Sequence, residues 1–424
     1  MKKFFKKIIE IFIGHFAKRI IKRSETLVVG VTGSVGKTST KDAIHTVLSS
    51  KFNASKSWGN FNSELGLPLA VAGYKESDTS AGFWFGVLLR MFSLAYLHKE
   101  EVNDILVLEM GADFPGDIEK LVKIAPPDIG VVTNVSISHL EKFGRLTRIV
   151  SEKKKLPEAV HERGFSVLCG DDKKVMSMAK KVKSEIITFG LGKNNLIKAT
   201  NIVFHWGGRG SNGKIEYGMN FKLNYNDKIV PVRIKNVLGI QQVYASLAAA
   251  CCGIAVGMNL IEIAEALGRY EAPKGRLEVI KGRKGSVILD DTYNASPVSA
   301  LAALDVLGEI SAKVKVAVLA DMLELGSKER KGHEEVGKMA GQVADVILTY
   351  GERSQFIAKS AAKAEKIKGN IVRHFETQEE LVEYLDTLLK EKVVVLVKGS
   401  RGMHMERVVE AIMESPRSLS DKYN

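Results

Sequence analysis

The stretch VVGVTGSVGKTSTKD, positions 28–42, constrains the fold more than any other part of the chain. An apolar, β-branched run leads into a turn with Gly33 and Gly36, and Lys37 and Thr38 follow directly. Such a turn between a strand and a helix presents backbone N–H groups to phosphate oxygens. We expect Lys37 to reach the β and γ phosphates of a nucleotide and Thr38 to ligate Mg²⁺. The strand before the turn and the helix after it argue against a chance glycine-rich turn.

The chain continues with short β-branched runs that alternate with longer helical stretches, which is typical of a parallel sheet covered by helices. Strands are predicted in TLVVGVTG (26–33), DILVLEMGA (104–112) and DIGVVTNV (128–135). Residues 201–237 alternate instead between polar and apolar positions with Gly and Asn between them, which predicts antiparallel hairpins. A second alternation of strands and helices begins at GSVILDDTYN (285–294).

The length of 424 residues exceeds what one hydrophobic core usually supports. We therefore predict a basic amphipathic helix in residues 1–24, a central ATP-binding domain in 25–272 and a C-terminal domain in 273–424. The fold class is α/β, with a mostly parallel central sheet plus a β appendage. The C-terminal domain is predicted to be smaller, doubly wound and Rossmann-like. The Pro- and Gly-containing segment RYEAPKGRLE (269–278) marks the linker between the domains.

Positive charge is concentrated at the N-terminus. Residues 1–24 contain eight Lys or Arg and one Glu, which is more than half of the net charge of +13. One helical face carries the apolar side chains Phe5, Ile8, Ile9, Phe12, Phe16 and Ile20. Two interpretations stay open: docking on an anionic membrane surface, and packing of the helix on its own domain. A basic stripe with interleaved aromatics is absent elsewhere, so no nucleic acid partner is expected.

A second apolar stretch, from Ala81 to Leu97, is too short to span a bilayer and contains Arg90. We expect a core helix there, with membrane or partner contact as the lesser alternative. The three cysteines show neither C-x-x-C spacing nor a disulfide framework, which favours a reducing cytoplasm. The expected location is cytoplasmic, with peripheral contact to the inner face of the membrane as the open addition, and the expected state is a monomer.

The exact form of the loop indicates a family. The usual spacing G-x-x-x-x-G-K-[ST] has glycine where this chain has Val31, and T-G-S-V-G-K-T (32–38) resembles the ATP loop of the Mur ligase family and its folylpolyglutamate synthase relatives. Further segments agree in order: GNFNSELGLPL (59–69), LEMGA (108–112), TNVSISHLEKFG (133–144), DDTYNASP (290–297), ADMLELG with His333 (320–333) and VKGSRGMHMERVVEAI (397–412). The resemblance covers about residues 26–415.

The resemblance implies an ATP-dependent amide ligase of peptidoglycan precursor synthesis. In the family's reaction a substrate carboxylate attacks the γ-phosphate of ATP, and an amine then displaces phosphate from the acyl phosphate. The segments look most like the member that adds D-alanyl-D-alanine to a UDP-N-acetylmuramoyl tripeptide. Positioning and cationic stabilisation should then supply most of the catalysis. ATP and Mg²⁺ are the implied cofactors.

The resemblance also assigns site residues. Lys37, Glu109, His139 and Lys153 are the implied catalytic residues, and Thr38, Glu109, His139 and Lys153 the implied metal site. The family modifies a lysine at the place of Lys153 to a carbamate in several members. Without the resemblance, the run from Glu152 to Lys155 would be a solvated helix face.

Nucleotide and substrate contacts are implied in the same way. The nucleotide-binding set is Thr32, Gly33, Ser34, Val35, Gly36, Lys37, Thr38, Ser39, Asn134, Gln242, Arg276, Asp291 and Asn294. The substrate-binding set is Asn60, Asn62, Ser63, Lys398, Ser400 and Arg401. The C-terminal members of both sets imply a site completed when the two domains close.

The chain departs from the family pattern at two places. The family segment G-x-H-N-V-x-N reads Gly-Ile-Gln-Gln-Val-Tyr-Ala at 239–245, where amide side chains can still form hydrogen bonds. Only about 25 residues precede the first predicted strand, where the family usually has a domain for the uridine nucleotide. Two alternatives therefore stay open: a ligase of this type with another acyl or amine substrate, and a membrane-docked nucleotide-binding scaffold without turnover.

Overall fold

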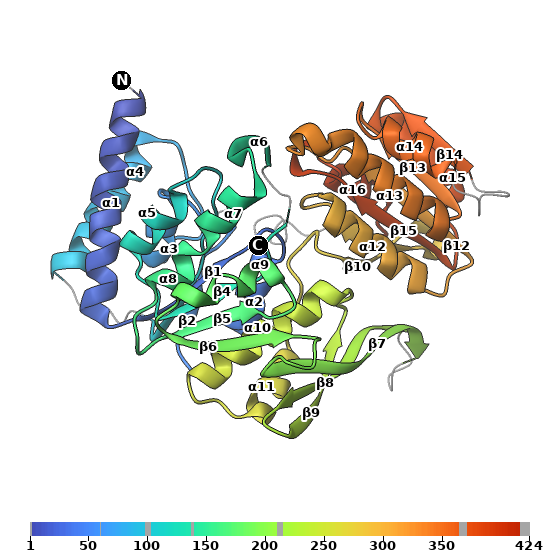
Figure 1. Ribbon diagram of the computed structural model, residues 1–424. Coiled ribbons are helices and arrows are strands. Elements are labelled where there is room, and N and C mark those ends of the chain that lie inside the picture. Colours follow the sequence, from blue (N-terminus) through green and yellow to red (C-terminus); the bar gives the residue numbers. More distant parts are fainter. Residues whose placement is uncertain are drawn as a thin grey trace.

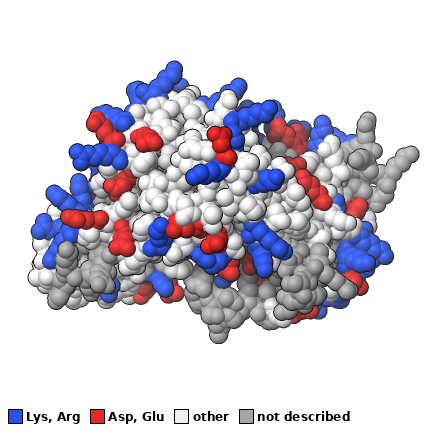
Figure 2. Space-filling model, turned by 90° about the horizontal axis from the view of Figure 1, so that it is seen from below, with Lys and Arg blue, Asp and Glu red and all other residues white. Residues whose placement is uncertain are grey.

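The structure is a computed structural model that describes residues 2–59, 61–97, 103–136, 140–209, 215–363 and 371–415. Two lobes, each built around its own sheet, lie beside one another (Figure 1). On the face seen in Figure 2, Lys and Arg side chains are interspersed with Asp and Glu rather than separated from them. In the described part of the chain, no helix has the length and hydropathy needed to cross a bilayer.

The central lobe contains a sheet with the strand order β2-β3-β1-β4-β5-β6-β7-β8-β9. Neighbours from β2 to β7 are parallel, and β7, β8 and β9 are antiparallel. The predicted strands and hairpins are confirmed, but the hairpins extend the main sheet because β7 pairs with β6. The bounds are β1 Leu27–Thr32, β2 Ala54–Lys56, β3 Ile105–Glu109, β4 Ile129–Val132, β5 Phe165–Cys169, β6 Glu185–Gly190, β7 Ile197–Arg209, β8 Ile215–Tyr225 and β9 Lys228–Lys235.

Helices cover both faces of this sheet, as the nearly continuous apolar strands require. Along β1, Val29 and Val31 join the core beneath α2, α10 and α11, whereas Val28 points to the opposite core beneath α1 and α3. The bounds are α2 Lys37–Leu48, α3 Gly66–Val71, α4 Ala81–Phe92, η1 Ser93–Leu97, α5 Asp117–Ile124, α6 Leu140–Phe143, α7 Leu146–Lys153, α8 Lys155–Ala159, α9 Lys173–Met176, η2 Ala179–Lys181, α10 Ile240–Ala255 and α11 Leu260–Leu267.

The N-terminal helix α1, Lys2–Ser24, packs on the central lobe against α3, α4, η1 and α5. Its buried side chains are Ile13, Phe16, Ala17, Ile20 and Ile21. Of the two interpretations left open, packing of the helix on its own domain therefore holds for the inward face of α1. Phe12, expected on that face, is instead 51% exposed. The side chain of Phe5 lies outside the described residues.

The expectation of a core helix at Ala81–Leu97 is confirmed for one face of the segment only. Helix α4 and the π-helical turn η1 lie on the surface and bury only Val87, Met91, Leu94 and Ala95. The opposite side of the same helix is apolar and exposed, because the stretch is hydrophobic on more than the one face that the lobe can cover.

The C-terminal lobe has the strand order β10-β11-β15-β12-β13-β14, parallel except for β10. Leu289 and Leu396 enter the core on one face, and Ile288 and Val395 enter the core on the other, so the sheet is doubly wound as predicted. The bounds are β10 Glu278–Lys281, η3 Arg283–Gly285, β11 Val287–Asp291, α12 Pro297–Glu309, β12 Val314–Ala320, η4 Gly326–Lys328, α13 Glu329–Val343, β13 Val346–Tyr350, α14 Gln355–Ala361, β14 Ile371–Phe375, α15 Gln378–Leu388, β15 Val393–Lys398, η5 Arg401–Met403 and α16 Glu406–Ile412.

Candidate active site

The loop after β1 has the conformation that its glycines make possible. Gly36, directly before the first residue of α2, has φ 83°. This left-handed backbone conformation is strained for residues with a side chain. Gly33 has φ 154°, and a Cβ added there would overlap the side chain of Thr133. The loop therefore lies directly against the carboxyl end of β4, at the edge where parallel sheets bind ligands.

Residues after β4 hold the loop in place. The Thr133 hydroxyl donates to the carbonyl oxygen of Val35 at 2.8 Å, and the Val35 N–H donates to the Asn134 side-chain oxygen at 2.8 Å. The Ser34 N–H donates to the Asn134 carbonyl oxygen at 2.9 Å. Asn134, predicted to contact nucleotide, thus positions the loop through both its side chain and its backbone. Thr32 is buried and donates to the carbonyl oxygen of Met110 at 2.9 Å.

Glu109, the last residue of β3, lies beside the start of α2. The Thr38 hydroxyl donates to one Glu109 carboxylate oxygen at 2.9 Å, and the Asn62 amide donates to the other at 3.3 Å. Glu109 is buried, so its carboxylate is oriented by these two contacts. Hydroxyl and carboxylate oxygens are the ligands that Mg²⁺ prefers. Thr38 and Glu109 therefore fit the predicted metal site in chemistry and in proximity.

Two lysines meet on one carbonyl oxygen of the loop. The Lys37 and Lys153 amines donate to the Gly33 oxygen at 3.0 Å and 2.8 Å. Burial lowers the pKa of Lys37, and the Glu109 charge partly opposes that shift. Burial also lowers the pKa of Lys153 well below its usual range, and the neighbouring Lys37 charge adds to the effect. Two amines beside the phosphate loop, both at the wall of one cleft, are suited to stabilising negative charge.

Glu152, next to Lys153 but outside the cleft lining, has a structural role that sequence reasoning missed. Its carboxylate accepts from the Gly116 and Ile118 N–H groups at 2.9 Å and 2.8 Å, at the start of α5. Glu152 and Lys153 are only 3% and 4% exposed, so the expectation of a solvated face fails for these two positions. A carboxylate at a helix N-terminus is favourable because it satisfies unpaired N–H groups there.

A cleft of about 760 Å³ lies between the two lobes. The predicted residues that line it are Ser34, Val35, Gly36, Lys37, Thr38, Asn62, Ser63, Glu109, Lys153, Arg276, Asn294, Ser400 and Arg401. The described predicted residues that do not line it are Thr32, Gly33, Ser39, Asn134, Gln242, Asp291 and Lys398. Lys6 and Glu10 of α1 also line it, although no sequence motif placed the N-terminal helix there.

Arg276 lines the cleft on the side opposite the phosphate loop, where it stacks on Tyr293. Its guanidinium lies 4.1 Å from the ring centroid of Tyr293, and that of Arg401 lies 5.8 Å from the same ring. The buried Nε of Arg276 has no hydrogen-bond partner in the described part of the chain. The Arg276 charge reaches across the cleft, where it contributes to the lowered pKa of Lys37. A stacked arginine facing the loop is suited to phosphate recognition.

Asp291 and Lys398 contact each other rather than the cleft. The Lys398 amine donates to the Asp291 carboxylate at 2.6 Å and to the Asn294 carbonyl oxygen at 2.9 Å. Burial raises the pKa of Asp291 and lowers that of Lys398, and their mutual attraction opposes both shifts. Ser400 accepts from the Leu323 N–H at 2.9 Å and lines the cleft.

Gln242 is buried within the interior. Its amide donates to the Arg276 carbonyl oxygen at 3.2 Å and accepts from the Tyr270 hydroxyl at 2.8 Å. The same hydroxyl lies 3.2 Å from the Ser39 carbonyl oxygen. Gln242 thus links α10 to the segment that carries Arg276, and its direct contact with nucleotide stays a prediction.

Asn60 and His139 lie outside the described residues, so the structure does not place these two predicted side chains. Within the described ranges, the candidate site included, no three His, Cys, Asp or Glu side chains are grouped as for a metal ion. Mg²⁺ commonly keeps several waters and binds through one or two carboxylates plus phosphate oxygens. The Thr38 and Glu109 pair is compatible with that mode of binding.

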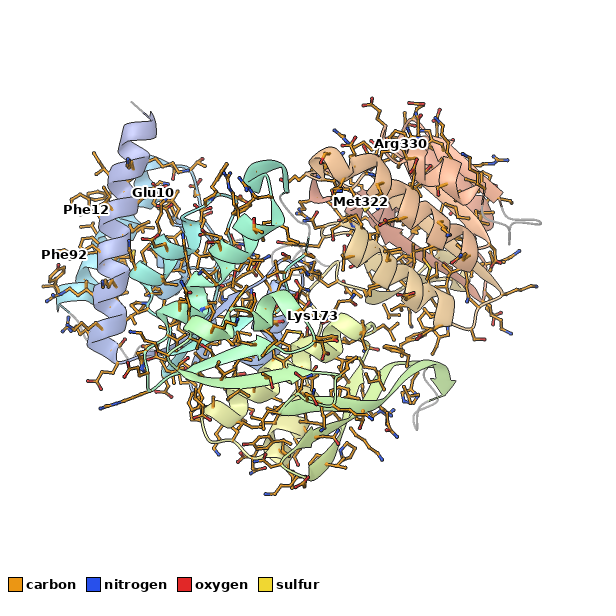
Figure 3. All side chains as sticks on the ribbon, viewed as in Figure 1. Glu10, Phe12, Phe92, Lys173, Met322 and Arg330 are labelled. Carbon is orange, nitrogen blue, oxygen red and sulfur yellow. The ribbon has the colours of Figure 1, made fainter. Side chains whose placement is uncertain are left out.

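His333 positions the loop that brings Leu323, Glu324 and Leu325 to the cleft. Its Nε2 accepts from the Met322 N–H at 3.0 Å, and its Nδ1 lies 2.8 Å from the Glu329 carbonyl oxygen, so the neutral ring donates there. Met322 lies on the side of the C-terminal lobe toward the central lobe (Figure 3). A second ring proton would face the Met322 N–H and break this arrangement.

We expect His333 to make stability depend on pH. Burial lowers its pKa below the ordinary value of 6.5, so the unfolded chain binds the proton more readily than the folded chain. The stability that the neutral ring contributes is complete above about pH 6.5 and is lost as the pH falls through the folded-state pKa. His333→Gln should show a smaller loss of unfolding free energy between pH 7.5 and 5.5. Urea unfolding of both proteins at the two pH values measures this difference, and equal losses would contradict it.

The fold and the site define a class: a two-domain α/β protein whose phosphate loop faces a second, doubly wound domain across a cleft. Two family models match, the Mur ligase middle domain over residues 31–83 and 90–253 and the Mur ligase glutamate ligase domain over 275–401. The chain belongs to the Mur ligase family.

Individual relatives and solved structures agree with this assignment. The UDP-N-acetylmuramoyl-tripeptide–D-alanyl-D-alanine ligase of Bacillus subtilis is 31% identical over 406 residues, covering 95% of this chain and 79% of the relative. The Escherichia coli enzyme of the same name is 29% identical over 407 residues, covering 95% and 80%. The crystal structure of MurF ligase from Thermotoga maritima in complex with ADP has a TM-score of 0.78 at 28% identity, covering 95% and 83%.

Proposed function

We propose that this protein joins D-alanyl-D-alanine to the tripeptide of a UDP-N-acetylmuramoyl tripeptide, with ATP converted to ADP and phosphate. The names of the relatives support the substrates, because the similarity extends over nearly the whole chain. The observation that carries the proposal is the shared cleft, in which the phosphate loop with Lys37 and Lys153 faces Arg276 and Arg401. That arrangement surrounds a transferring phosphoryl group with positive charge.

The proposed reaction has two steps. A carboxylate oxygen of the tripeptide attacks the γ-phosphorus, the bond to the β-phosphate oxygen breaks, and ADP leaves. The amine of D-alanyl-D-alanine, having lost a proton, then attacks the acyl carbon; the nitrogen releases a second proton to solvent, and phosphate leaves with the former carboxylate oxygen. In both steps charge builds up on oxygens that face the lysines. The chain mainly holds the reactants in place, which accounts for a large part of such catalysis.

We assign roles to the residues accordingly. Thr38 and Glu109 would hold Mg²⁺, which when bound neutralises charge on the phosphates. Asn62, held against Glu109 by its amide, and Ser63 belong to the side where the acyl substrate would lie. Ser400 and Arg401 belong to the acceptor side. The metal role of His139, the substrate role of Asn60 and the carbamate on Lys153 stay predictions.

The remaining assignments concern the chain as a whole. We place the boundary between the catalytic domains at residues 272 and 273, within the segment that connects α11 to β10. We further propose that the protein works as a monomer in the cytoplasm. The three cysteines are buried free thiols, which is consistent with a reducing compartment.

Mass spectrometry of the products tests the function. The protein is mixed with ATP, Mg²⁺, UDP-N-acetylmuramoyl tripeptide and D-alanyl-D-alanine, and we expect a new amide at the sum of the two substrate masses minus water. ADP should form in equal amount and only when both substrates are present. Turnover with another amine, such as glutamate, but not with D-alanyl-D-alanine would support the alternative of a ligase with a different amine substrate. Nucleotide binding without any ADP release would select the scaffold.

A further inference from the structure

The surface where α1 and α4 lie side by side is apolar and uncovered in the described part of the chain. Fourteen large hydrophobic side chains are exposed among all described residues, and seven of them lie on α1, α4 and η1. These seven, which we call the aromatic patch, are Ile11, Phe12, Phe85, Leu89, Phe92, Tyr96 and Leu97. Half of these exposed hydrophobic side chains thus lie on adjacent helices, which distinguishes the patch from singly scattered surface hydrophobics.

The patch is one continuous surface. On α4 and η1, Phe85, Leu89, Phe92 and Tyr96 follow one another at spacings of three or four residues and therefore share one helical face. Phe16 joins the two helices, because its ring lies 6.0 Å from Phe92 and 6.1 Å from Tyr96 between ring centroids.

Polar contacts fix this junction between the helices. The His15 ring nitrogen lies 2.9 Å from the Tyr96 hydroxyl, and Arg19 donates to the Ala95 carbonyl oxygen at 3.2 Å. Phe12 and Phe92 point outward on the same side of the molecule (Figure 3). The two helices thus present their aromatic side chains together and in a fixed arrangement.

A row of positive charge follows the patch. The outward side of α1 carries three exposed lysines at helical spacing, Lys7, Lys18 and Lys22. The exposed Ile11 lies between them on the same side. The only acidic residue in 1–24, Glu10, is instead paired with Lys6 at 3.9 Å on the side that lines the cleft. The outward side of α1 therefore combines exposed apolar groups with cations and carries no acidic group within residues 6–24.

We propose that the aromatic patch and the outward lysines of α1 dock the protein on an anionic lipid surface. Aromatic and aliphatic side chains on one side and Lys or Arg beside them are the composition that binds the boundary between headgroups and acyl chains. A second copy of this chain is a poorer occupant, because a symmetric contact would bring two rows of lysines together. The docking face is composite and includes α4, whereas the inward face of α1 is buried in the protein.

The proposal also relates the lipid surface to the cleft. Helix α1 carries the outward lysines on one side, and its residues Lys6 and Glu10 line the cleft on another. Because α1 is packed along its inward face against α3, α4 and α5, docking would hold the cleft in a fixed orientation to the lipid surface. This inference does not depend on the identity of the substrates.

Co-sedimentation with vesicles tests the proposal on the full chain. We expect binding to vesicles that contain about 30% phosphatidylglycerol, weak binding to pure phosphatidylcholine, and loss of binding as salt is raised. Each lysine near such a surface contributes about fivefold to binding, so Lys18→Glu with Lys22→Glu should reduce it by at least about 25-fold. Phe85→Ser with Leu89→Ser should also weaken it, and these side chains are exposed enough to be replaced without loss of the fold.

Matched controls separate docking from general charge and hydrophobicity. Lys331→Glu and Ile261→Ser change side chains of similar exposure away from α1 and α4 and should leave vesicle binding unchanged. Circular dichroism confirms that each variant is folded. Absence of binding to anionic vesicles, or equal loss in the control variants, would overturn the proposal. So would a dimer in light scattering that dissociates in the Phe85 and Leu89 variant while vesicle binding stays unchanged.

Discussion

Replacement of Lys37 by alanine is expected to lower kcat for amide formation by about 10²–10³-fold, the usual effect of removing one charge-stabilising group from an active site. Lys37 begins α2, lines the cleft and is held against the loop by the Gly33 carbonyl oxygen. Its side chain is half-buried in the cleft, and electrostatic interactions there are stronger than in bulk water. A continuous assay of ADP release at saturating substrate concentrations gives the change in kcat.

The comparison variant is Lys51→Ala. Lys51 follows α2 but is exposed and paired with Glu262 at 3.0 Å, so its loss should leave kcat unchanged. Nucleotide binding measured by calorimetry shows whether Lys37→Ala acts on the reaction beyond binding. Full amide formation by the Lys37 variant would remove the proposed mechanism, even if nucleotide binding had weakened.

The sequence predicted the phosphate loop because its signal is local. The pattern of Gly33, Gly36, Lys37 and Thr38 lies within six adjacent positions, and the strand before it and the helix after it have different hydrophobic periods. The buried strands β1, β3 and β4 were predicted for the same reason, whereas the buried strand β5 was not named. The edge strand β14 was not identified, because IVRHF at 371–375 is at most half-buried and has no continuous apolar run.

Burial of Glu152 and Lys153 could not be read from the run of charges that contains them. A solvated helix face and a buried pair have the same composition, and only the approach of α5 and of the Gly33 loop distinguishes them. The resemblance to a known family predicted a site role for Lys153 but not the role of Glu152 at the start of α5. The exposed side of α4 was missed because an apolar stretch does not show how much of its surface the fold will cover.

Long-range pairs are the hardest to predict. Asp291 and Lys398 are 107 positions apart, and they become direct neighbours only because β15 inserts between β11 and β12. Both were predicted as ligand contacts from the resemblance to the family, and their positions at the ends of apolar strands agreed with that prediction. The sheet order shows that two such positions can satisfy each other instead.

We expect Lys398→Met to lower the free energy of unfolding by about 3–5 kcal/mol, because it leaves the Asp291 carboxylate buried without its cation. The Lys398 side chain is 2% exposed and that of Asp291 is 10% exposed, so water cannot replace the lost contact. The double variant with Asp291→Leu removes both charges and should recover most of the stability.

Denaturant unfolding of the wild type, both single variants and the double variant forms a thermodynamic cycle that measures the coupling between the two residues. A structural pair predicts strong coupling in stability, with ligation recovering alongside stability in the double variant. Ligand contacts predict the opposite: each single variant keeps the stability of the wild type, and the double variant has the lowest activity of all. The short contact between the two side chains and their separation from the cleft favour the first result.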